Sequence, residues 1–311
     1  MTISGDDIRI GIASGGDAST IRALEARPID SLWAGGHIAS RNPSPEAMVG
    51  LVRLATLTER VTVGTSILLL PLYPPALVAK QIADLDRATG GRVILGVGVG
   101  GEYPQEFNAV QVPIEERGRR TNEMIPLLRQ LWTAEGVTHN GRYYPMQNVK
   151  IHPPPVQPGG PPIIVAGRKE LAMRRAALLG DGWFPYMYSP RRYADSVATI
   201  RQSAADAGRD LADFQWCVWV FLNINPDGDI AREEAARTMG GAYNQDFRAM
   251  IDSVAAAGTA AEVVAKLQSF YDAGARHFIF LPATAGADQQ PVLDRLFAEV
   301  VPALHDHANQ S

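Results

Sequence analysis

The chain has 311 residues, of which 46% are hydrophobic and 20% are charged, a composition typical of globular proteins with a large core. Its formal net charge is −4 at pH 7, which argues against a nucleic-acid-binding surface. No apolar run approaches the roughly 20 residues of a membrane span, and residues 1–7 do not resemble a secretory signal. The single cysteine, Cys217, cannot form an intrachain disulfide or a thiolate metal cluster. We therefore expect a cytoplasmic protein without nucleic-acid or membrane partners.

Short β-branched runs alternate with longer amphipathic stretches along the chain. The predicted strands are residues 8–13, 30–34, 61–66, 92–97, 162–166, 182–185, 216–222 and 276–281. The predicted helices are residues 45–58, 75–89, 114–132, 170–179, 190–207, 259–273 and 291–305. Strands that alternate with helices pair in parallel through right-handed crossovers. Eight such strands favour an α/β fold of the (β/α)8 TIM-barrel type, with residues 1–311 forming a single domain.

Two segments interrupt this alternation and are predicted to be insertions. Residues 135–161 contain Asn140-Gly141 between short β-prone pieces, followed by a proline-rich stretch, which predicts a hairpin and an extended connection after strand four. Residues 224–258, around strand seven, contain two helical stretches that we expect to be separated at Gly240-Gly241.

Active sites of such barrels lie at the carboxyl ends of the strands, so the residues there are the candidates. His37 follows strand two, and a histidine in this position is a candidate proton donor or acceptor, although a loop histidine can also be purely structural. Glu102, after strand four, is the second candidate for proton transfer.

Glycines and a helix start suggest where a ligand could approach the backbone. Gly98, Gly100 and Gly101 leave room for a ligand, although they lack the dinucleotide-binding register and also fit a tight turn. Residues 166–168 lead directly into a helix, whose free N–H groups and the Arg168 guanidinium suit a phosphate. A solvated arginine in an ordinary loop is the alternative.

Aromatic residues near the same strand ends offer a wall for an apolar or planar substrate. These candidate substrate residues are Trp33, Trp183, Tyr186 and Tyr188. Core packing explains Trp33 equally well.

The sequence contains no motif for catalysis by a metal or by a protein nucleophile. There is no His-x-His on the first strand, no His-Glu-x-x-His and no Gly-x-Ser-x-Gly. The chemistry is therefore expected to come from an organic cofactor that the protein positions.

Several motifs occur in an order that is similar to a known family. They are Asp30-Ser-Leu-Trp33 followed by His37, Val61-Thr-Val-Gly-Thr65, the run from Pro75 through Lys80 and Asp86 to Gly90-Gly-Arg92, Leu95-Gly-Val-Gly98, and Leu179-Gly-Asp-Gly-Trp183-Phe. Together they resemble the bacterial luciferase-like superfamily of flavin- and F420-dependent oxidoreductases. The resemblance covers essentially the whole chain and implies the same barrel, with an insertion after strand four.

The resemblance also implies roles for particular residues. His37 matches the family's histidine near the flavin or deazaflavin ring, and Ser66-Ile67 matches a non-prolyl cis peptide that supports the ring. The turn from Gly98 to Gly101 and the loop around Gly167 and Arg168 match the cradle of the cofactor phosphate. The cofactor-binding residues implied in this way are Ser66, Ile67, Gly98, Val99, Gly100, Gly101, Ala166, Gly167 and Arg168.

Two departures bear on the choice of cofactor. The flavin luciferases carry an arginine at the end of strand four, where this chain has Val99, and an acidic residue just before the histidine, where it has Gly36. Both differences favour coenzyme F420 over FMN.

The resulting hypothesis is an F420-dependent oxidoreductase that transfers a hydride between the deazaflavin and a small organic substrate. One alternative is a two-component monooxygenase that receives reduced FMN from a separate reductase. The other is a non-catalytic flavin- or F420-binding protein. A cofactor-free lyase would need a metal or lysine constellation that the sequence lacks. The family resemblance also implies a homodimer, for which the helices at 45–58 and 75–89 are the candidate contacts.

Overall fold

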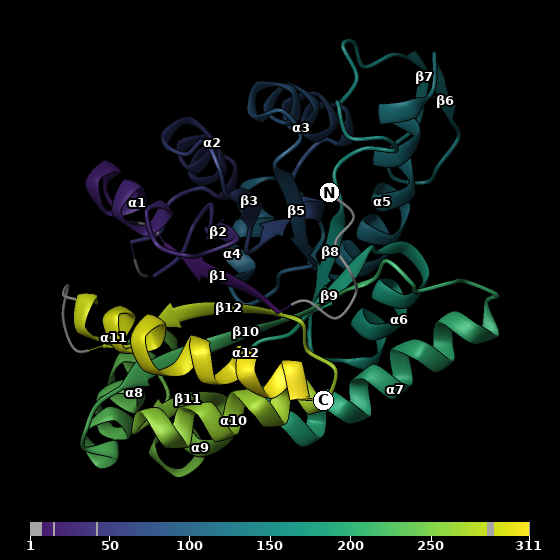
Figure 1. Cartoon of the computed structure of the whole chain (residues 1–311). Helices are drawn as coiled ribbons and strands as arrows, with labels where there is room; N and C mark the ends of the chain where they lie inside the picture. Colours follow the sequence, from purple (N-terminus) through teal and green to yellow (C-terminus); the bar gives the residue numbers. More distant parts are fainter. Residues whose placement is uncertain (1–7, 15, 42, 285–288, 311) are drawn as a thin grey trace. The chain divides into compact units, whose positions relative to one another are not determined.

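The computed structural model describes residues 8–14, 16–41, 43–284 and 289–310. The chain divides into two compact units (Figure 1). The N-terminal unit consists of Ala13–Gly182, and the C-terminal unit consists of Met1–Ile12 and Trp183–Ser311. The expectation that residues 1–311 form one domain remains a prediction.

Four parallel strands form the sheet of the N-terminal unit, in the order β2, β3, β5 and β8. Their bounds are Ser31–Ala34 for β2, Thr62–Thr65 for β3, Val93–Gly98 for β5 and Ile163–Ala166 for β8. A two-residue strand, β4 (Leu68–Leu69), pairs with the end of β5. All residues of β2 and β5 are buried, as expected for a parallel sheet that is covered on both faces. The strands predicted in this unit are confirmed.

Helices follow these strands, and most match the predicted ranges. The described α-helices of this unit are α1 (Ala18–Glu25), α2 (Ala47–Leu57), α3 (Pro75–Thr89), α4 (Pro104–Ala109), α5 (Arg117–Thr133) and α6 (Glu170–Leu179). Short 3-10 turns lie at Leu70–Leu72 and Ile114–Glu116. The sequence did not predict α1 and α4, because elements of eight and six residues are too short to show a helical period.

The hairpin predicted in the first insertion is present. Strands β6 (Val137–His139) and β7 (Met146–Val149) pair in an antiparallel arrangement. Glu123 of α5 accepts hydrogen bonds from the backbone N–H groups of Tyr143 and Tyr144, at 3.0 and 2.9 Å. These bonds hold the hairpin beside α5 (Figure 1).

Two charged residues of the family-like motifs have structural roles. The buried Asp86 of α3 accepts hydrogen bonds from the backbone N–H groups of Val156 and Gln157, at 2.8 and 3.0 Å. Arg92 donates to the carbonyl oxygens of Val61 and Thr58, at 2.6 and 2.8 Å. Asp86 therefore fixes the proline-rich connection, and Arg92 fixes the entry into β3.

The C-terminal unit has its own parallel strands, in the order β1, β12, β10 and β11, with β9 also pairing with β10. Their bounds are Arg9–Ala13 for β1, Gly182–Phe184 for β9, Gln215–Ile224 for β10, Ala255–Gly258 for β11 and His277–Pro282 for β12. The described helices are α7 (Pro190–Asp206), α8 (Gly228–Tyr243), α9 (Ile251–Val254), α10 (Ala260–Asp272), α11 (Gln290–Arg295) and α12 (Val301–Gln310). A 3-10 turn lies at Arg248–Met250 and a π-turn at Leu296–Val300.

The second insertion differs from the prediction in two ways. Helix α8 runs through Gly240-Gly241 without interruption to Tyr243, and its C-cap, Asn244, has a left-handed conformation. The residues Ala255–Gly258 form strand β11, which the sequence analysis missed. Alanine favours helices, so this strand is set by its pairing with β10, where Phe221 lies opposite Ala255, and not by local preference.

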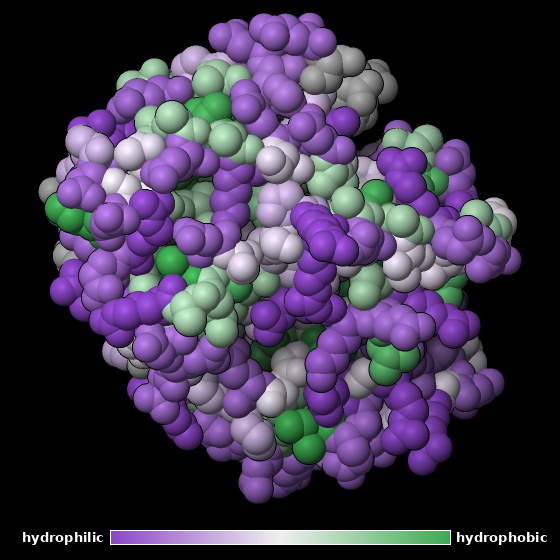
Figure 2. Space-filling view, turned by 90° about the horizontal axis from the view of Figure 1, so that it is seen from below, coloured by the Kyte–Doolittle hydropathy of each residue, from purple (hydrophilic) through white to green (hydrophobic). Residues whose placement is uncertain are grey.

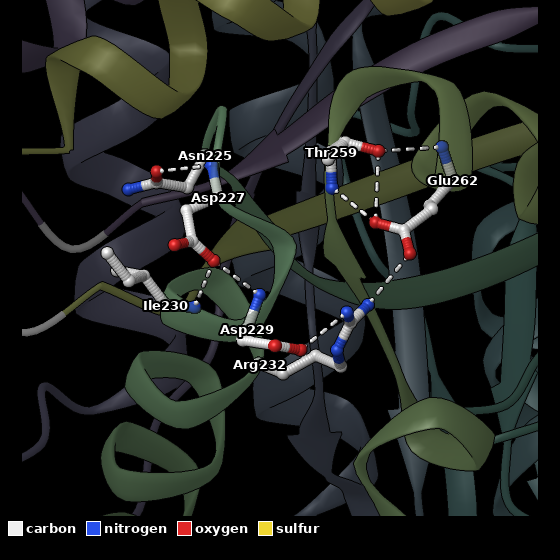
Figure 3. A network of polar contacts seen from close by, with 7 residues as sticks. All are labelled: Asn225, Asp227, Asp229, Ile230, Arg232, Thr259 and Glu262. Atoms are coloured by element: carbon white, nitrogen blue, oxygen red, sulfur yellow. Dashed lines mark hydrogen bonds and ion pairs between the residues drawn. The ribbon is translucent and has the colours of Figure 1, made fainter.

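The starts of α8 and α10 are capped by side chains that join into one network (Figure 3). Asp227 accepts from the backbone N–H groups of Asp229 and Ile230, at 3.0 and 3.3 Å. Thr259 and Glu262 form a reciprocal capping box at the start of α10. Arg232 donates to Asp229 at 2.9 Å and to Glu262 at 3.1 Å, so it links the two helices.

Because α8 passes through two glycines, we expect the Gly241→Ala variant to be more stable by about 1 kcal/mol. No heavy atom lies within 4 Å of the position of a Cβ at Gly241, so the new methyl group makes no clash that would offset the gain in helix propensity. At Gly240 a Cβ would lie 3.0 Å from the Gln245 carbonyl oxygen. Gly240→Ala is therefore the matched control, in which this close contact offsets the gain in helix propensity and the stability does not rise. Thermal and urea unfolding of both variants measure the difference. Equal effects at the two positions would contradict the prediction.

None of the described helices is both long enough and apolar enough to cross a membrane. The molecular face in Figure 2 is mostly hydrophilic, with apolar residues in small, separate groups.

Candidate active site at the strand ends of the N-terminal unit

The carboxyl ends of β2, β3 and β5 lie very close together. The Ser66 backbone N–H donates to the Ala34 carbonyl at 2.8 Å, and the Thr65 hydroxyl donates to the Gly96 carbonyl at 2.7 Å. A Cβ at Gly96 would lie only 2.0 Å from the Thr65 carbonyl oxygen, so a glycine is required for this approach. The strand ends therefore form a compact backbone surface.

The peptide bond between Ser66 and Ile67 is cis, as the family resemblance implied. The Ser66 hydroxyl oxygen is buried, and it has no hydrogen-bond partner among the residues that the structure describes. The Ile67 side chain covers the next strand, because its Cδ1 lies 2.0 Å from the position of a Cβ at Gly98. The side chain of residue 67 thus occupies the space that glycine leaves at position 98.

After β5 the chain turns at two glycines with positive φ, +66° at Gly100 and +113° at Gly101. In the described part of the chain, no hydrogen-bond acceptor is bonded to the backbone N–H group of either glycine. A Cβ at Gly100 would lie 3.3 Å from the Phe107 ring, and a Cβ at Gly101 would lie 3.0 Å from Arg117 Nε. The turn therefore presents two unused donors, with Arg117 directly beside it.

The loop after β8 lies next to this turn, because β5 and β8 pair with Val97 opposite Val165. Gly167 has a φ of +135°, and helix α6 begins at Glu170 after an N-cap, Lys169, whose side chain makes no capping bond. The first turn of α6, which has no side-chain cap, and the half-buried Arg168 are the two features from which a phosphate site was predicted.

His37 is in contact with a carboxylate that the sequence analysis missed. Its Nδ1 atom lies 3.3 Å from both carboxylate oxygens of Glu106 on α4. The Glu106 side chain is fully buried and also accepts from the Ile38 backbone N–H at 2.8 Å, while 27% of the His37 side chain is exposed. The Tyr103 ring packs against the imidazole in a T-shaped arrangement, with 4.8 Å between the ring centroids. His37 is therefore held on one side and accessible on the other.

The loop that leads into α2 is bonded to the backbone of this histidine, because the Pro45 carbonyl accepts from the His37 N–H at 3.0 Å. Glu46 caps α2 by accepting from the Met48 and Val49 N–H groups, at 3.0 and 2.8 Å. The Tyr73 hydroxyl donates to the same carboxylate. Burial raises the pKa of Tyr73 above its ordinary value, and the negative charges of Glu46 and Glu106 raise this pKa further. Tyr73 therefore stays protonated as a donor at neutral pH.

Glu102, the second predicted proton-transfer residue, is exposed and has no hydrogen bond or ion pair to another described residue. The carboxylate that contacts His37 is Glu106 instead. No long-range signal in the sequence pointed to Glu106, because 69 positions separate it from His37 and α4 was not predicted.

Trp33 does not fit the predicted substrate wall. Its ring is completely buried, its indole N–H donates to the Ser31 hydroxyl at 2.8 Å, and two of its carbons lie 2.5 Å from the position of a Cβ at Gly64. Trp33 is therefore a core residue, which was the alternative reading of the sequence.

The other aromatic candidates lie in the C-terminal unit. Trp183 is fully buried against Tyr188 and Tyr193, with ring centroids 5.6 and 5.2 Å away, and Tyr188 is 3% exposed. Core burial leaves no open ring face on Trp183 or Tyr188 for a substrate. Tyr186 is only partly buried and lies opposite Trp219 of β10, so it is the one member of this predicted group with an accessible surface.

These features fit a tricyclic cofactor with a phosphorylated tail. The buried Ser66 hydroxyl and Arg117 Nε have no partner among the described residues, and buried polar groups normally have one. Ser66 directly follows β3, and Arg117 Nε lies 3.0 Å from the position of a Cβ at Gly101, in the turn after β5. The donor set offers hydrogen bonds to a ring system and to an anion.

A model of the luciferase-like monooxygenase family matches residues 18–277 of this chain. The chain belongs to this family. An F420-dependent glucose-6-phosphate dehydrogenase of Beutenbergia cavernae is 30% identical over 321 residues, covering 94% of each chain. An uncharacterized protein of Mycobacterium tuberculosis is 35% identical over 167 residues, which is 54% of this chain and 57% of the length of that relative.

Among solved structures, an F420-dependent secondary alcohol dehydrogenase in complex with an F420-acetone adduct is similar, with a TM-score of 0.83 and 21% identity. The match covers 96% of this chain and 99% of that one. This likeness shows the fold, and the predicted (β/α)8 TIM barrel is confirmed.

Proposed function

We propose that this luciferase-like protein is an F420-dependent oxidoreductase that acts on a small organic substrate. The observation that carries the proposal is the accessible His37, held by the buried Glu106 in the unit that also contains the Ser66-Ile67 and Gly98–Gly101 backbone surface. The names of the Beutenbergia relative and of the alcohol dehydrogenase structure support F420 as the cofactor.

The backbone surface and the glycine turn would hold the cofactor. Ser66, Ile67 and Gly98 would contact the ring, and the Ser66 hydroxyl would gain a hydrogen-bond partner there. The phosphate cradle would consist of Val99, Gly100, Gly101, Ala166, Gly167 and Arg168. When bound, the deazaflavin supplies hydride chemistry.

His37 would move the proton that accompanies hydride transfer. An ionised Glu106 can only accept hydrogen bonds, so the hydrogen of a neutral His37 ring lies on Nδ1. Nε2 is then the acceptor, and it can take a proton from a substrate hydroxyl or return it in the reverse reaction. Glu106 is thus a positioning residue that selects the tautomer.

The test is cofactor binding followed by turnover. Purified protein is titrated separately with F420 and with FMN, and absorption and fluorescence report binding. Reduction of bound F420 is then measured with a panel of secondary alcohols and sugar phosphates, the substrate classes in the names of the two F420-dependent relatives. We expect micromolar or tighter binding of F420 and substrate-dependent loss of its visible absorbance.

A two-component FMN monooxygenase is the second candidate, since the family model carries the description luciferase-like monooxygenase. Tight FMN binding with substrate-dependent oxygen uptake, together with no binding of F420, would replace the proposal by this one and call for a separate reductase. Cofactor binding without turnover of any kind would instead indicate a carrier protein.

We also propose a homodimer that associates through α2 and α3. These helices pack against each other and expose apolar side chains, with Val49 66%, Val52 42% and Leu77 49% exposed. The cytoplasmic location and a substrate contact from Tyr186 likewise remain proposals.

A further inference from the structure

A pocket of about 440 Å³ lies in the C-terminal unit and is lined by residues of α8, α9, β11 and α10. Pockets of this size hold small organic molecules. Arg232 in its wall already donates to Asp229 and Glu262, at 2.9 and 3.1 Å (Figure 3). Lys266 of α10 is the other basic residue of the lining, and among the residues that the structure describes no carboxylate forms an ion pair with it. The pocket therefore contains an amine without a carboxylate partner.

The Lys266 side chain is partly buried, and its amine is held by backbone carbonyls. Nζ donates to the carbonyl oxygens of Asp252 in α9 and Ala255 in β11. A neutral primary amine has two N–H groups and one lone pair. Both carbonyls therefore keep a donor when the amine is neutral, and the lone pair remains for an electrophile that enters the pocket.

The surroundings of Lys266 also favour the neutral amine. Burial lowers the pKa of Lys266 to about 8, and the negative charge of Asp252 opposes this shift. The other charged residues of the lining, Arg232 on α8 and Glu262 on α10, pair with each other at 3.1 Å. An amine with this pKa is about half neutral at pH 8, whereas a lysine with the ordinary pKa is only about 0.4% neutral.

The other three lysines of the chain have surroundings that favour the charged form. Lys80 pairs with Asp84 at 2.7 Å, and Lys150 pairs with Glu135. Lys169 is exposed to water. A nearby carboxylate or full hydration stabilises the ammonium, which has no lone pair and is not a nucleophile. These three lysines provide an internal comparison for Lys266.

We propose that Lys266 is a modification site that accepts the acyl group of an acyl phosphate. Nζ forms a bond to the acyl carbon, and the bond from this carbon to the phosphate oxygen breaks. Phosphate leaves with the electron pair, and the nitrogen loses a proton to water. The product amide is uncharged and has a single N–H, so at least one of the carbonyls of Asp252 and Ala255 loses its hydrogen bond. This inference does not depend on the cofactor or on the proposed function.

The experiment incubates the full-length protein with acetyl phosphate at pH 8 and follows each of the four lysines by peptide mass spectrometry. We expect Lys266 to be acetylated at least about 10-fold faster than any other lysine, because a larger share of its amine is neutral. In protein unfolded by urea the four rates should agree within about three-fold, since the difference comes from the fold. Acetylated protein should also unfold at a lower temperature than unmodified protein, as the loss of a buried hydrogen bond requires.

Two variants and a matched control complete the test. Lys266→Arg should remove most of the early gain in intact mass, and Lys150→Arg, the control, should not. Asp252→Asn removes the charge that opposes the shift, so it should raise the rate at Lys266 about two-fold or more. Circular dichroism checks the fold, and the wild-type rates decide the question if Lys266→Arg does not fold. A rate at Lys266 no higher than at Lys169, or an equal advantage in unfolded protein, overturns the inference.

Discussion

Replacement of His37 by alanine is expected to lower the rate of F420 reduction by at least about 100-fold, the usual contribution of a positioned acid or base. The imidazole contacts Glu106 and the Tyr103 ring, and neither contact belongs to the glycine turn or to the start of α6. The dissociation constant of the cofactor should therefore change by less than about three-fold. Stopped-flow reduction with the best substrate of the panel and a fluorescence titration measure the two quantities.

Added imidazole should restore part of the rate of His37→Ala, because the cavity left by the side chain opens to solvent on its exposed side. His37→Asn keeps a hydrogen bond to Glu106 but cannot act as a base near pH 7, so it should be as slow as the alanine variant. A His37→Ala protein with wild-type kcat would remove the histidine from the mechanism and would favour the carrier alternative.

Glu106→Gln and Glu102→Gln separate the two carboxylates that follow β5. Glu106→Gln should lower kcat about ten-fold and change the pH profile of kcat, because an amide can donate to Nδ1 and so no longer fixes the tautomer. Glu102→Gln should leave both unchanged, since Glu102 is exposed and makes no ion pair or hydrogen bond to the described residues. A larger effect at Glu102 would return the proton-transfer role to the residue that the sequence suggested.

Elements with a strong local signal could be predicted from the sequence, and elements set by distant contacts could not. Helices α3 and α6 have the predicted bounds because apolar periodicity and a terminal proline or glycine mark them. Strand β11 was missed because its sequence, Ala-Ala-Ala-Gly, has no strand preference and depends on β10 for its conformation. The interruption predicted at Gly240-Gly241 was wrong because a glycine in a helix is a cost that the surrounding packing can offset.

The same distinction applies to the candidate site. His37, the cis peptide and the glycine turn each follow a strand within a few residues of its end. The residues at the predicted strand ends were therefore sufficient to find these three features. Glu106 reaches His37 from α4, a helix that begins after the end of β5, and this contact depends on the path of the connecting loop. Burial corrected the aromatic candidates, because a sequence does not tell a tryptophan of the core, such as Trp33, from one that faces a ligand.

Restoring the acidic residue that luciferases carry before the histidine is expected to damage this protein. A Cβ at Gly36 would lie 2.0 Å from the Pro45 carbonyl oxygen and 2.8 Å from the Ala47 nitrogen, and both are backbone atoms that cannot rotate away. The His37 N–H donates to the same Pro45 carbonyl at 3.0 Å, so relief of the clash must also move His37. We expect Gly36→Asp to lower the unfolding free energy by about 3 kcal/mol and the reduction rate by about 100-fold.

Gly36→Ala distinguishes the steric effect from the charge. If the clash is the cause, alanine and aspartate should be almost equally harmful, as measured by urea unfolding and by the rate of F420 reduction. If aspartate is tolerated and only alanine is harmful, the new carboxylate must have found a partner, and the loop around Pro45 must be able to move. In that case the crowding at Gly36 would not explain why the carboxylate that contacts His37 comes from α4. The expected result instead ties the two features together: the loop leaves no room for a side chain at position 36, and Glu106 reaches the imidazole from another element.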